Sequence, residues 1–480
     1  MNRAADFQRP FSRRHWLQTA TCGFGGLALH SLLAREAQAA KPTARSGPLA
    51  PQASHHPARA KRVIFLFMAG GPSQADLFDP KSLIAKRHGQ TVAAPVDKDQ
   101  IRVGVEKFLA LGPIAPVRPR GESGMMMSDL LPNLARVADD LCLLRAMHTD
   151  NKAHAPATLQ FHTGTLAEEL PSMGSWVSYG LGTENENLPS FITIHAPGDA
   201  RTYGASFLPP VHQGTPLNVP ENDRAAAIKY LNDPDTALAV QRRRLDFIQR
   251  MNRRLLGQAD TDVQMEGLIE SFELAFRMQL ETPKLIDLAG ETKETLELYG
   301  VGTEGSDRNG RACLLARRLS EAGVRFVQVT VGGWDHHGNI AGELPGRCAS
   351  VDKPIAGLLM DLKRRGLLDE TLVLWSGEFG RSQWSQDVSG TAPIIQHGRE
   401  HQQESFCAWM AGGGVKPGLT HGATDDFGYR PIAGRVHLHD LHATMLHLMG
   451  LDHKRLTHRQ AGRDFRLTDV YGNVIEEILA

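Results

Sequence analysis

The sequence predicts an α/β fold in which helices flank a mainly parallel β-sheet. Short apolar runs recur along the chain, and each ends at glycines or polar residues. Because strands that are buried on both faces are apolar throughout, such runs are typical of a parallel sheet. Amphipathic segments lie between several of the runs, which is the alternation of an α/β domain. The composition agrees, since 41% hydrophobic and 22% charged residues are ordinary for a globular chain of 480 residues.

Residues 1–39 are expected to be a Tat signal peptide. Arg13 and Arg14 form a twin arginine, a weakly apolar run covers residues 20–34, and residues 37–39 form a small-x-small cleavage site. The run is too short and too rich in glycine to span a bilayer, so an uncleaved anchor is the lesser alternative. We therefore expect export by the Tat route to the periplasm or beyond, with no membrane span in the mature chain.

Charge and cysteine content argue against two classes of protein. The formal net charge is +0, whereas a nucleic-acid-binding protein needs a basic surplus on one face. One of the five cysteines lies in the predicted leader, and the others lack CxxC spacing. We expect no disulfide framework, although a single bridge stays open as an alternative because connectivity is not readable from sequence.

The folded domain is expected to cover residues 61–480, after a flexible linker over residues 40–60 that is rich in Pro, Ala, Ser and His. Its first strand, residues 61–68, is apolar and is expected at the centre of the sheet. Five further strands are predicted at residues 141–147, 190–195, 324–331, 371–375 and 405–410. Helices are predicted at residues 128–141, about 154–163, 225–231, 238–256, 263–280, 310–322, 351–365 and 438–449.

The region from about 220 to 300 contains amphipathic helices and no strand, so it is expected to be a helical insertion. Arginines at 242–244 and 253–254 resemble a basic patch. The acidic residues around them instead favour a solvated helix face. We expect this insertion to pack outside the sheet and to contribute no ligand to a site.

Two predicted strand ends carry side chains that suit a metal ion. Asp335 and His337 follow the strand at 324–331, and Glu378 follows the strand at 371–375. Since ligands of open α/β sheets bind beyond the carboxyl ends of the strands, these side chains are expected in one site. Carboxylate and imidazole are ligands for hard and borderline divalent cations. Either stretch alone could equally cap a turn, but two together favour the metal.

Other polar residues at strand and helix ends have competing interpretations. Ser73 follows the first strand and is a candidate nucleophile, but the sequence Gly-Gly-Pro-Ser is also ordinary turn chemistry, which we favour. His154 and Thr158 lie near a predicted helix N-terminus, where backbone N–H groups favour an anion. The helix at 438–449 carries three histidines among leucines and methionines, so packing or hydrogen bonding is favoured over metal binding. These histidines are His439, His442 and His447.

Five short motifs resemble those of one family. They are Gly70-Gly71-Pro72-Ser73, Gly333-Trp334-Asp335-x-His337, Gly377-Glu378-Phe379-Gly380-Arg381, Gly398-Arg399-Glu400-His401 and Ala461-Gly462-Arg463-Asp464-Phe465. In this order they closely resemble a secreted bacterial family, domain of unknown function 1501, a branch of the alkaline phosphatase and sulfatase superfamily. The resemblance covers about residues 61–480. It implies an alkaline-phosphatase-like α/β sandwich and metal-assisted hydrolysis of phosphate or sulfate esters.

The resemblance also implies roles for particular residues. Asp335, His337 and His401 would hold a divalent cation such as Zn, Mn or Ca, bordered by Glu378 and Asp76. In addition, Arg381 would neutralise an anionic substrate, and His154 would act as nucleophile or as general acid/base. His154 has this assignment because it stands at the nucleophile position of a stretch that is similar to the sulfatase signature. We expect it to face the ligands from the opposite side as a neutral imidazole.

The chain also departs from the superfamily pattern. Thr158 stands where sulfatases have an arginine, and residues 70–71 are glycines where the superfamily has an aspartate, which Asp76 or Asp79 would have to replace. Glu378-Phe379-Gly380 stands in place of Asp-His-Gly. Retention of the other ligand residues favours an exported metal-dependent hydrolase that acts on an anionic small-molecule or glycan ester. The departures favour the alternative, a catalytically inactive sulfatase-like protein that binds anionic glycans or cell-envelope components.

Overall fold

The computed structural model describes residues 47–92, 108–219, 228, 231, 233, 235–256, 263–387 and 390–480. The predicted signal peptide lies outside the described residues, as does most of the predicted helix at 225–231. Among the described residues, no helix combines the length and the apolar character that a membrane span requires.

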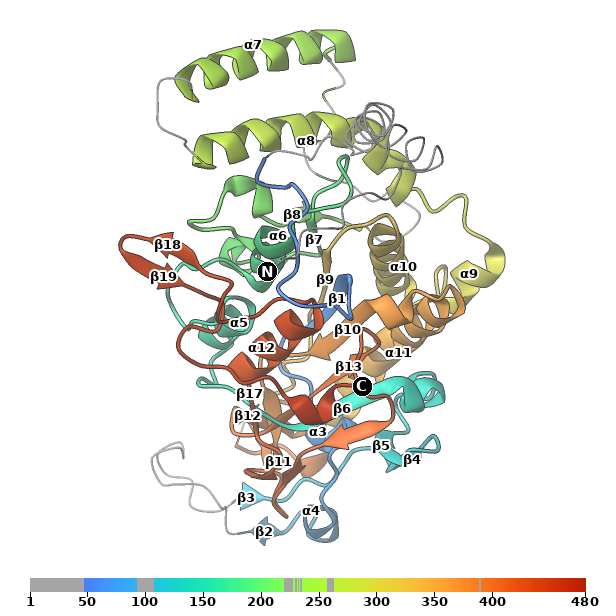
Figure 1. Ribbon diagram of the computed structural model, residues 1–480. Helices are drawn as coiled ribbons and strands as arrows, with labels where there is room; N and C mark the ends of the chain where they lie inside the picture. Colours follow the sequence, from blue (N-terminus) through green and yellow to red (C-terminus); the bar gives the residue numbers. More distant parts are fainter. Residues whose placement is uncertain are drawn as a thin grey trace, which may run out of the picture. The chain divides into compact units, whose positions relative to one another are not determined.

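A nine-stranded sheet forms the centre of the fold, in the order β14-β6-β13-β10-β1-β9-β7-β8, with β17 also paired to β6 (Figure 1). Its central strand β1 pairs in parallel with β10 and β9, and only β13 runs antiparallel to its neighbours. The predicted mainly parallel sheet is therefore confirmed. The strands are β1 (Arg62–Met68), β6 (Leu141–His148), β7 (Phe191–Ile194), β8 (Thr215–Leu217), β9 (Phe326–Val331), β10 (Thr371–Ser376), β13 (Phe406–Ala411), β14 (Leu419–His421) and β17 (Val436–His437).

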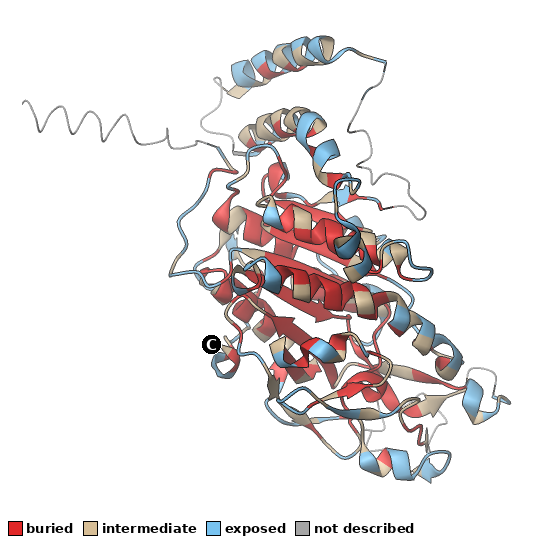
Figure 2. Ribbon diagram, turned by 90° about the vertical axis from the view of Figure 1, so that its right-hand side faces the viewer, coloured by how far each residue is buried: buried red, intermediate tan, exposed pale blue. Residues whose placement is uncertain are grey.

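Helices cover both faces of this sheet, as the alternation of side chains along β1 requires. Ile64, Leu66 and Met68 pack in one apolar cluster with residues of α10 (Asp307–Glu321) and α11 (Ile340–Arg364). Val63, Phe65 and Phe67 face the other way, in a cluster with residues of α5 (His154–Thr163), α6 (Met173–Leu181) and α12 (Leu438–Leu448). Figure 2 shows the buried residues concentrated in the sheet and in the helices beside it.

The direction of the strands places several loops along one edge of the sheet. Because β13 is antiparallel to both β10 and β6, these two strands run the same way, and β1 and β9 run with them. The segments that follow β1, β6, β9 and β10 therefore leave the same edge. This is the edge at which ligands of open α/β sheets are bound.

Three helices make up the predicted insertion: α7 (Leu238–Leu256), α8 (Val263–Ile286) and α9 (Lys293–Leu298). Helix α7 packs against α8, and α8 packs against the 3-10 helix η4 and against α10 (Figure 1). The predicted range of α7 agrees with the structure, whereas α8 extends six residues beyond the predicted end at 280.

Short elements complete the fold. The antiparallel pairs are β2 (Thr91–Val92) with β3 (Phe108–Leu109), β4 (Val117–Arg120) with β5 (Met125–Ser128), β11 (Gly380–Gln386) with β12 (Gly398–Gln402), β15 (Ala423–Thr424) with β16 (Pro431–Ala433), and β18 (His458–Gln460) with β19 (Arg463–Phe465). The short helices are α3 (Gln74–Leu77), α4 (Ser82–Lys86), η2 (Leu134–Asp140), η3 (Ala200–Tyr203), η4 (Pro210–His212), η5 (Leu368–Glu370), η6 (Ile394–Gln396) and η7 (Glu476–Ile478).

Two predicted segments differ from the structure in kind, and the helix predicted at 351–365 begins earlier, at Ile340 of α11. The helix predicted at 128–141 is the end of β5 followed by the 3-10 helix η2, because Pro132 lacks an N–H and disfavours helical backbone before it. The linker predicted at 40–60 is fixed to the domain over its last residues. Backbone N–H groups of Gln52, His55 and Arg59 donate to carbonyls of α6 and of the end of α12. Apolar burial of Ala60 completes this attachment.

Candidate metal centre

Four side chains converge at the carboxyl edge of the sheet. His154, Asp335, His337 and His401 each offer one ligand atom, and these atoms all lie within 4.8 Å of one another. Asp335 Oδ1 is 3.1 Å from His154 Nε2, 2.9 Å from His337 Nε2 and 3.3 Å from His401 Nε2. We refer to these four residues as the His/Asp cluster.

The members of the His/Asp cluster come from three separate parts of the chain. Asp335 and His337 lie in the segment between β9 and α11, and His154 is the first residue of α5, which follows β6. His401 lies on β12, where pairing with β11 places it opposite Arg381. The sheet edge thus supplies three members directly, and a β-hairpin supplies the fourth.

The other ring nitrogen of each histidine is held by an oxygen. His154 Nδ1 is 2.6 Å from Glu378 Oε1, His337 Nδ1 is 2.5 Å from Gln386 Oε1, and His401 Nδ1 is 2.6 Å from the Lys152 carbonyl oxygen. Carbonyl and carboxylate oxygens only accept, so each Nδ1 donates. In a neutral imidazole this leaves the lone pair on Nε2. Three lone pairs therefore face Asp335.

This arrangement fits a divalent cation. Histidines that bind a metal usually donate their other N–H to a carboxylate or carbonyl oxygen, as all three do in this cluster. A zinc ion with bonds of about 2.1 Å would place its ligand atoms roughly 3.4 Å apart. The separations of 2.9–3.3 Å between Asp335 Oδ1 and the three Nε2 atoms are close to this value. His154 Nε2 is buried and has no hydrogen-bond partner of good geometry in the part of the chain that is described. A cation would satisfy this orphaned atom.

Arg381 does not face a substrate, which corrects the predicted role. Its side chain is 0% exposed. Nε donates to the Gly71 carbonyl at 3.0 Å, Nη1 donates to the Arg399 carbonyl at 3.1 Å, and Nη2 donates to Asp335 Oδ1 and to the Gly70 carbonyl. Burial of Asp335 opposes its ionisation, but the guanidinium outweighs burial and holds the pKa of Asp335 well below its usual range. Arg381 therefore orients Asp335 and keeps it charged.

Glu378 borders the His/Asp cluster, as predicted, without joining it. Its side chain is buried, and its two carboxylate oxygens accept from the Gly70 backbone N–H at 3.0 and 3.1 Å. Through Oε1 it also holds His154 Nδ1. Glu378 is thus a partner of one ligand residue, and the glycine at position 70 supplies its backbone donor.

Asp76 was expected to border the metal, but the structure places it in a separate ion pair. Its two oxygens accept from Arg399 Nε and Nη2, both at 2.8 Å, and both side chains are 0% exposed. The Ser73 hydroxyl is also buried and donates to Asp76 Oδ2 at 2.6 Å. Asp76 and Ser73 are therefore occupied by structural contacts, and the turn interpretation of Ser73 fits better than the nucleophile. Asp79 is likewise buried and pairs with Lys81 at 2.9 Å.

His154 lies within the His/Asp cluster rather than opposite to it, which corrects the expected placement. Its neutral state beside a cation stays a prediction. Burial lowers the pKa of His154, but the hydrogen bond and charge of Glu378 and the charge of Asp335 outweigh burial and raise it. Its neighbour His401 has the opposite shift, because burial and the charge of Arg381 lower its pKa to about 4.

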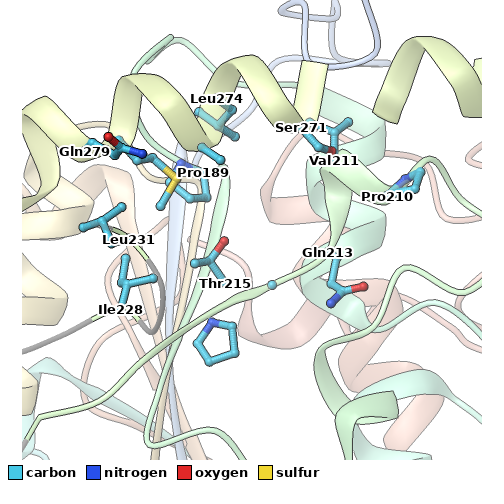
Figure 3. A pocket seen from close by; sticks show the side chains of 14 residues that line it. Pro189, Pro210, Val211, Gln213, Thr215, Ile228, Leu231, Ser271, Leu274 and Gln279 are labelled. Atoms are coloured by element: carbon cyan, nitrogen blue, oxygen red, sulfur yellow. The ribbon is translucent and has the colours of Figure 1, made fainter. Parts of the chain in front are cut away.

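A cleft of about 610 Å³ opens beside the cluster. It is lined by Asp335, His337, Gly338, Asn339, Glu343, Asp387, Ala392 and Gln396. A second cavity, of about 410 Å³, lies between α8 and the segment around β8 (Figure 3). Its lining is largely apolar, with Leu274, Met278 and Ile228 among the residues, and it includes no member of the His/Asp cluster.

Sequence reasoning missed several partners of the cluster. Gln386 and the carbonyl of Lys152 carry no signal, because an amide or a backbone oxygen gains a role only once the chain is folded around it. The sequence did contain an indication that His154 is a candidate ligand. It stands immediately after a predicted strand and polar loop, like Asp335 and His337, and this is the same reasoning that selected those two residues.

Fold and cluster together define an α/β protein with a candidate metal centre at the carboxyl edge of a mainly parallel sheet. Residues 60–479 match the model of the family described as "Protein of unknown function (DUF1501)", and the chain belongs to this family. The family expected from the five motifs is thereby confirmed. No curated protein matches the chain.

Several solved structures are similar to the chain at low identity. The lipoteichoic acid synthase LtaP from Listeria monocytogenes has a TM-score of 0.37 and 9% identity, over 87% of this chain and 78% of that chain. The PsFucS1 sulfatase from Pseudoalteromonas sp. has a TM-score of 0.34 and 13% identity, over 82% of this chain and 68% of the sulfatase chain. A variant of TAB5 alkaline phosphatase with bound Mg has a TM-score of 0.33 and 11% identity, over 82% of this chain and 99% of the phosphatase chain.

Proposed function

We propose that the protein is an exported, metal-dependent hydrolase of phosphate or sulfate esters. The observation that carries the proposal is the convergence of three histidine Nε2 atoms and one carboxylate oxygen, with every Nδ1 held by an acceptor. Such a set of donors is costly to assemble without a cation, because the lone pairs and the carboxylate repel one another.

The ligand set favours zinc or manganese over calcium. Three imidazoles and one carboxylate suit a borderline cation, whereas calcium prefers six to eight oxygens. A divalent cation bound by His154, Asp335, His337 and His401 would supply Lewis acidity toward an ester oxygen.

The protein's own residues set the charge and orientation of the site. Arg381 fixes Asp335, and Glu378 fixes His154. With one guanidinium and two carboxylates, these groups carry a net charge of about −1 when the histidines are neutral, which a divalent cation would turn positive. The loaded site would then attract an anionic group even though Arg381 itself is buried.

The cleft beside the cluster suggests what carries the ester. Asn339, Gln396 and Glu343 contribute amide and carboxylate groups to its lining. These groups accept hydrogen bonds from hydroxyls, and the amides also donate. An anionic small molecule or a glycan that bears a phosphate or sulfate ester therefore suits the site. The twin-arginine leader supports export to the periplasm or the exterior as part of the same proposal.

A second candidate function has an observation of its own. The buried Ser73 hydroxyl donates a hydrogen bond to Asp76. His154 donates through Nδ1 to Glu378, and its Nε2 faces Asp335 within the cluster. Within the described residues, neither side chain that was considered as a nucleophile is available for attack. This favours a catalytically inactive protein that binds an anionic glycan or a cell-envelope component, unless water is the nucleophile.

A panel of chromogenic phosphate and sulfate esters tests the proposal. The purified protein is treated with a chelator and then supplied with Zn, Mn or Ca in separate samples. We expect hydrolysis that the chelator abolishes and that Zn or Mn restores. Asp335→Asn should lose both metal and activity, and Asp464→Asn, on an exposed hairpin, serves as the control. Metal binding without hydrolysis of any ester would favour the second candidate, and absence of metal binding would rule out the first.

A further inference from the structure

Exposed apolar side chains concentrate on the insertion helices. Of the 12 large hydrophobic side chains that are exposed in the described part of the chain, eight lie on α7 and α8. Helix α7 alone carries five: Leu238, Phe247, Ile248, Met251 and Leu255. Since α7 packs on α8 and lies beyond it, none of the other described helices and strands covers its outer side (Figures 1 and 2).

The exposed apolar residues form a stripe on α7. Phe247, Met251 and Leu255 are spaced four residues apart, so they lie along one face of the helix. They are 57%, 54% and 54% exposed. The side that contacts α8 is a different one: Leu245 and Gln249 are buried there, and Gln249 Nε2 donates to the Ile269 carbonyl at 2.7 Å. Packing on α8 therefore does not use the stripe.

Arginines border this stripe. Helix α7 contains six arginines and one aspartate, hence a formal charge of +5. Arg243, Arg250 and Arg254 are exposed and lie three or four residues from Phe247 or Met251, so they flank the apolar side chains. Arg242 is the one arginine of α7 that forms ion pairs among the described residues, with Asp246 and Glu273. The exposed arginines agree with the expected solvated face, whereas Arg242 is half-buried in its ion pairs.

We propose that the outer face of α7 docks onto an anionic lipid bilayer, with the helix lying in the plane of the membrane surface. An apolar stripe with arginines at its border is the arrangement of helices that insert their apolar side among acyl chains and place their cations at anionic headgroups. The arginine stems reach past the apolar residues toward the headgroups. This inference does not depend on the proposed hydrolase function.

The charge and the apolar stripe of α7 together favour a bilayer over two other partners, a second copy of the chain and a polyanion in solution. Two copies of the chain that met through their α7 faces would bring two charges of +5 together, which opposes a dimer. A polyanion in solution would use the arginines but would leave Phe247, Met251 and Leu255 in water. Of these three occupants, an anionic bilayer is the one that engages both the cations and the stripe.

Co-sedimentation with vesicles tests the proposal. The full chain is mixed with vesicles of phosphatidylcholine, or of phosphatidylcholine with about one third phosphatidylglycerol, at low and at high salt. We expect binding to the anionic vesicles that weakens as salt rises, because screening reduces the attraction between exposed charges. Equal binding to both vesicle types, or binding to neither, would overturn the proposal.

Two variants of α7 isolate the two parts of the surface. Arg243→Gln with Arg250→Gln and Arg254→Gln should weaken binding about 100-fold, since each basic residue near an anionic surface contributes roughly fivefold. Phe247→Ser with Met251→Ser should also weaken it, by at least about tenfold. All variants keep residues 1–46, so any binding by that segment is the same in every sample.

Matched controls keep the test sharp. Arg87→Gln with Arg118→Gln and Arg435→Gln removes the same charge from exposed arginines outside α7 and should leave most of the binding intact. Thermal unfolding checks that each variant is folded. A loss of binding by the control equal to that of the α7 triple variant would show a general charge effect. If the Phe247/Met251 variant instead turns a dimer into a monomer and vesicle binding is absent, the stripe is a contact between copies.

Discussion

The His/Asp cluster and the first turns of α12 are both rich in histidine, but the Nε2 atoms of their imidazoles contact different kinds of groups. In α12, His439 Nε2 is 2.9 Å from the Gly164 carbonyl, and His442 Nε2 is 2.8 Å from the Phe161 carbonyl. Both rings therefore tie α12 to the C-terminal part of α5. In the cluster, Nε2 of each histidine points instead at a carboxylate and at the other rings. The partner of the second nitrogen, rather than the number of histidines, distinguishes a ligand from a packing residue.

The largest expected difference between the two regions is in metal affinity. His401→Ala removes a ligand and should weaken zinc binding more than about 100-fold, beyond the tenfold to 100-fold that loss of an outer partner causes. His442→Ala should leave zinc affinity unchanged, because its Nε2 is on a carbonyl. Isothermal titration calorimetry of both variants measures this. Comparable losses of zinc affinity in the two variants would contradict the division into ligand histidines and packing histidines.

His154→Ala extends this test to the residue whose placement was corrected. As a member of the cluster it should weaken zinc binding as strongly as His401→Ala. If His154→Ala instead keeps full metal content and loses only ester hydrolysis, the original role of His154 as a catalytic group outside the ligand set is restored.

For the free energy of unfolding we expect the reverse order, with the larger loss in the α12 variant. His442 is buried, so His442→Ala leaves a cavity and an unsatisfied carbonyl at Phe161 and should lower the free energy of unfolding by about 2–4 kcal/mol. His401→Ala in metal-free protein should lower it by about 1 kcal/mol or less, because its lost bond to the Lys152 carbonyl is near solvent. Urea unfolding in the presence of a chelator gives both values. Equal losses would contradict the packing role of α12.

The pH dependence of stability gives a smaller effect with a definite sign. Burial, and to a lesser extent the charge of His439, lowers the pKa of His442 from 6.5 to about 3. The unfolded chain therefore binds a proton that the folded chain does not, and stability is lost as pH falls from 6.5 toward 3. Between pH 8 and pH 5 this loss should be about 2 kcal/mol. The variant His442→Gln keeps an N–H donor but does not titrate, so a pH profile of unfolding identical to that of the wild type would contradict the assignment.

The smallest expected effect concerns an outer partner. Gln386→Leu removes the acceptor of His337 Nδ1 and should weaken zinc binding about tenfold, because the ring loses its fixed orientation and tautomer. Gln460→Leu, on the exposed hairpin of β18 and β19, is the control. An unchanged affinity in the first variant would mean that the Nδ1 bonds do not prepare the cluster.

Much of the fold was predictable, because its strands are apolar along their whole length. The runs at 61–68 and 371–375 are paired at the centre of the sheet, as expected. The direction of β13 was not predictable, since an apolar run between polar loops has no polarity of its own. The helix expected at 128–141 failed because its apolar spacing was weighed above the proline at 132, whose effect on the preceding turn prevailed.

The candidate site was predictable where a side chain follows a strand in sequence. Asp335 and His337 are examples, and the family motif added His401. Asp76 and Arg381 were assigned to the site from the resemblance, but Asp76 lies in a buried ion pair with Arg399, and the buried Arg381 contacts the site only through Asp335. An ion pair between residues 76 and 399 leaves no trace in local spacing. Burial, which decides whether an arginine meets a substrate or a neighbouring carboxylate, was the missing information.

The pairing of β1 also bears on when the protein can fold during its synthesis. Val63 aligns with Phe326 on one side and with Leu372 on the other, so the first strand has no lasting partner until most of the polypeptide exists. At about 5–20 residues per second, the ribosome needs roughly 15 to 60 s to pass from Val63 to Leu372. During that interval at least one edge of the apolar strand Arg62–Met68 has unpaired backbone. The centre of the sheet can therefore first close only after Leu372 has been made, and a chaperone that shields this segment has the whole of that time in which to act.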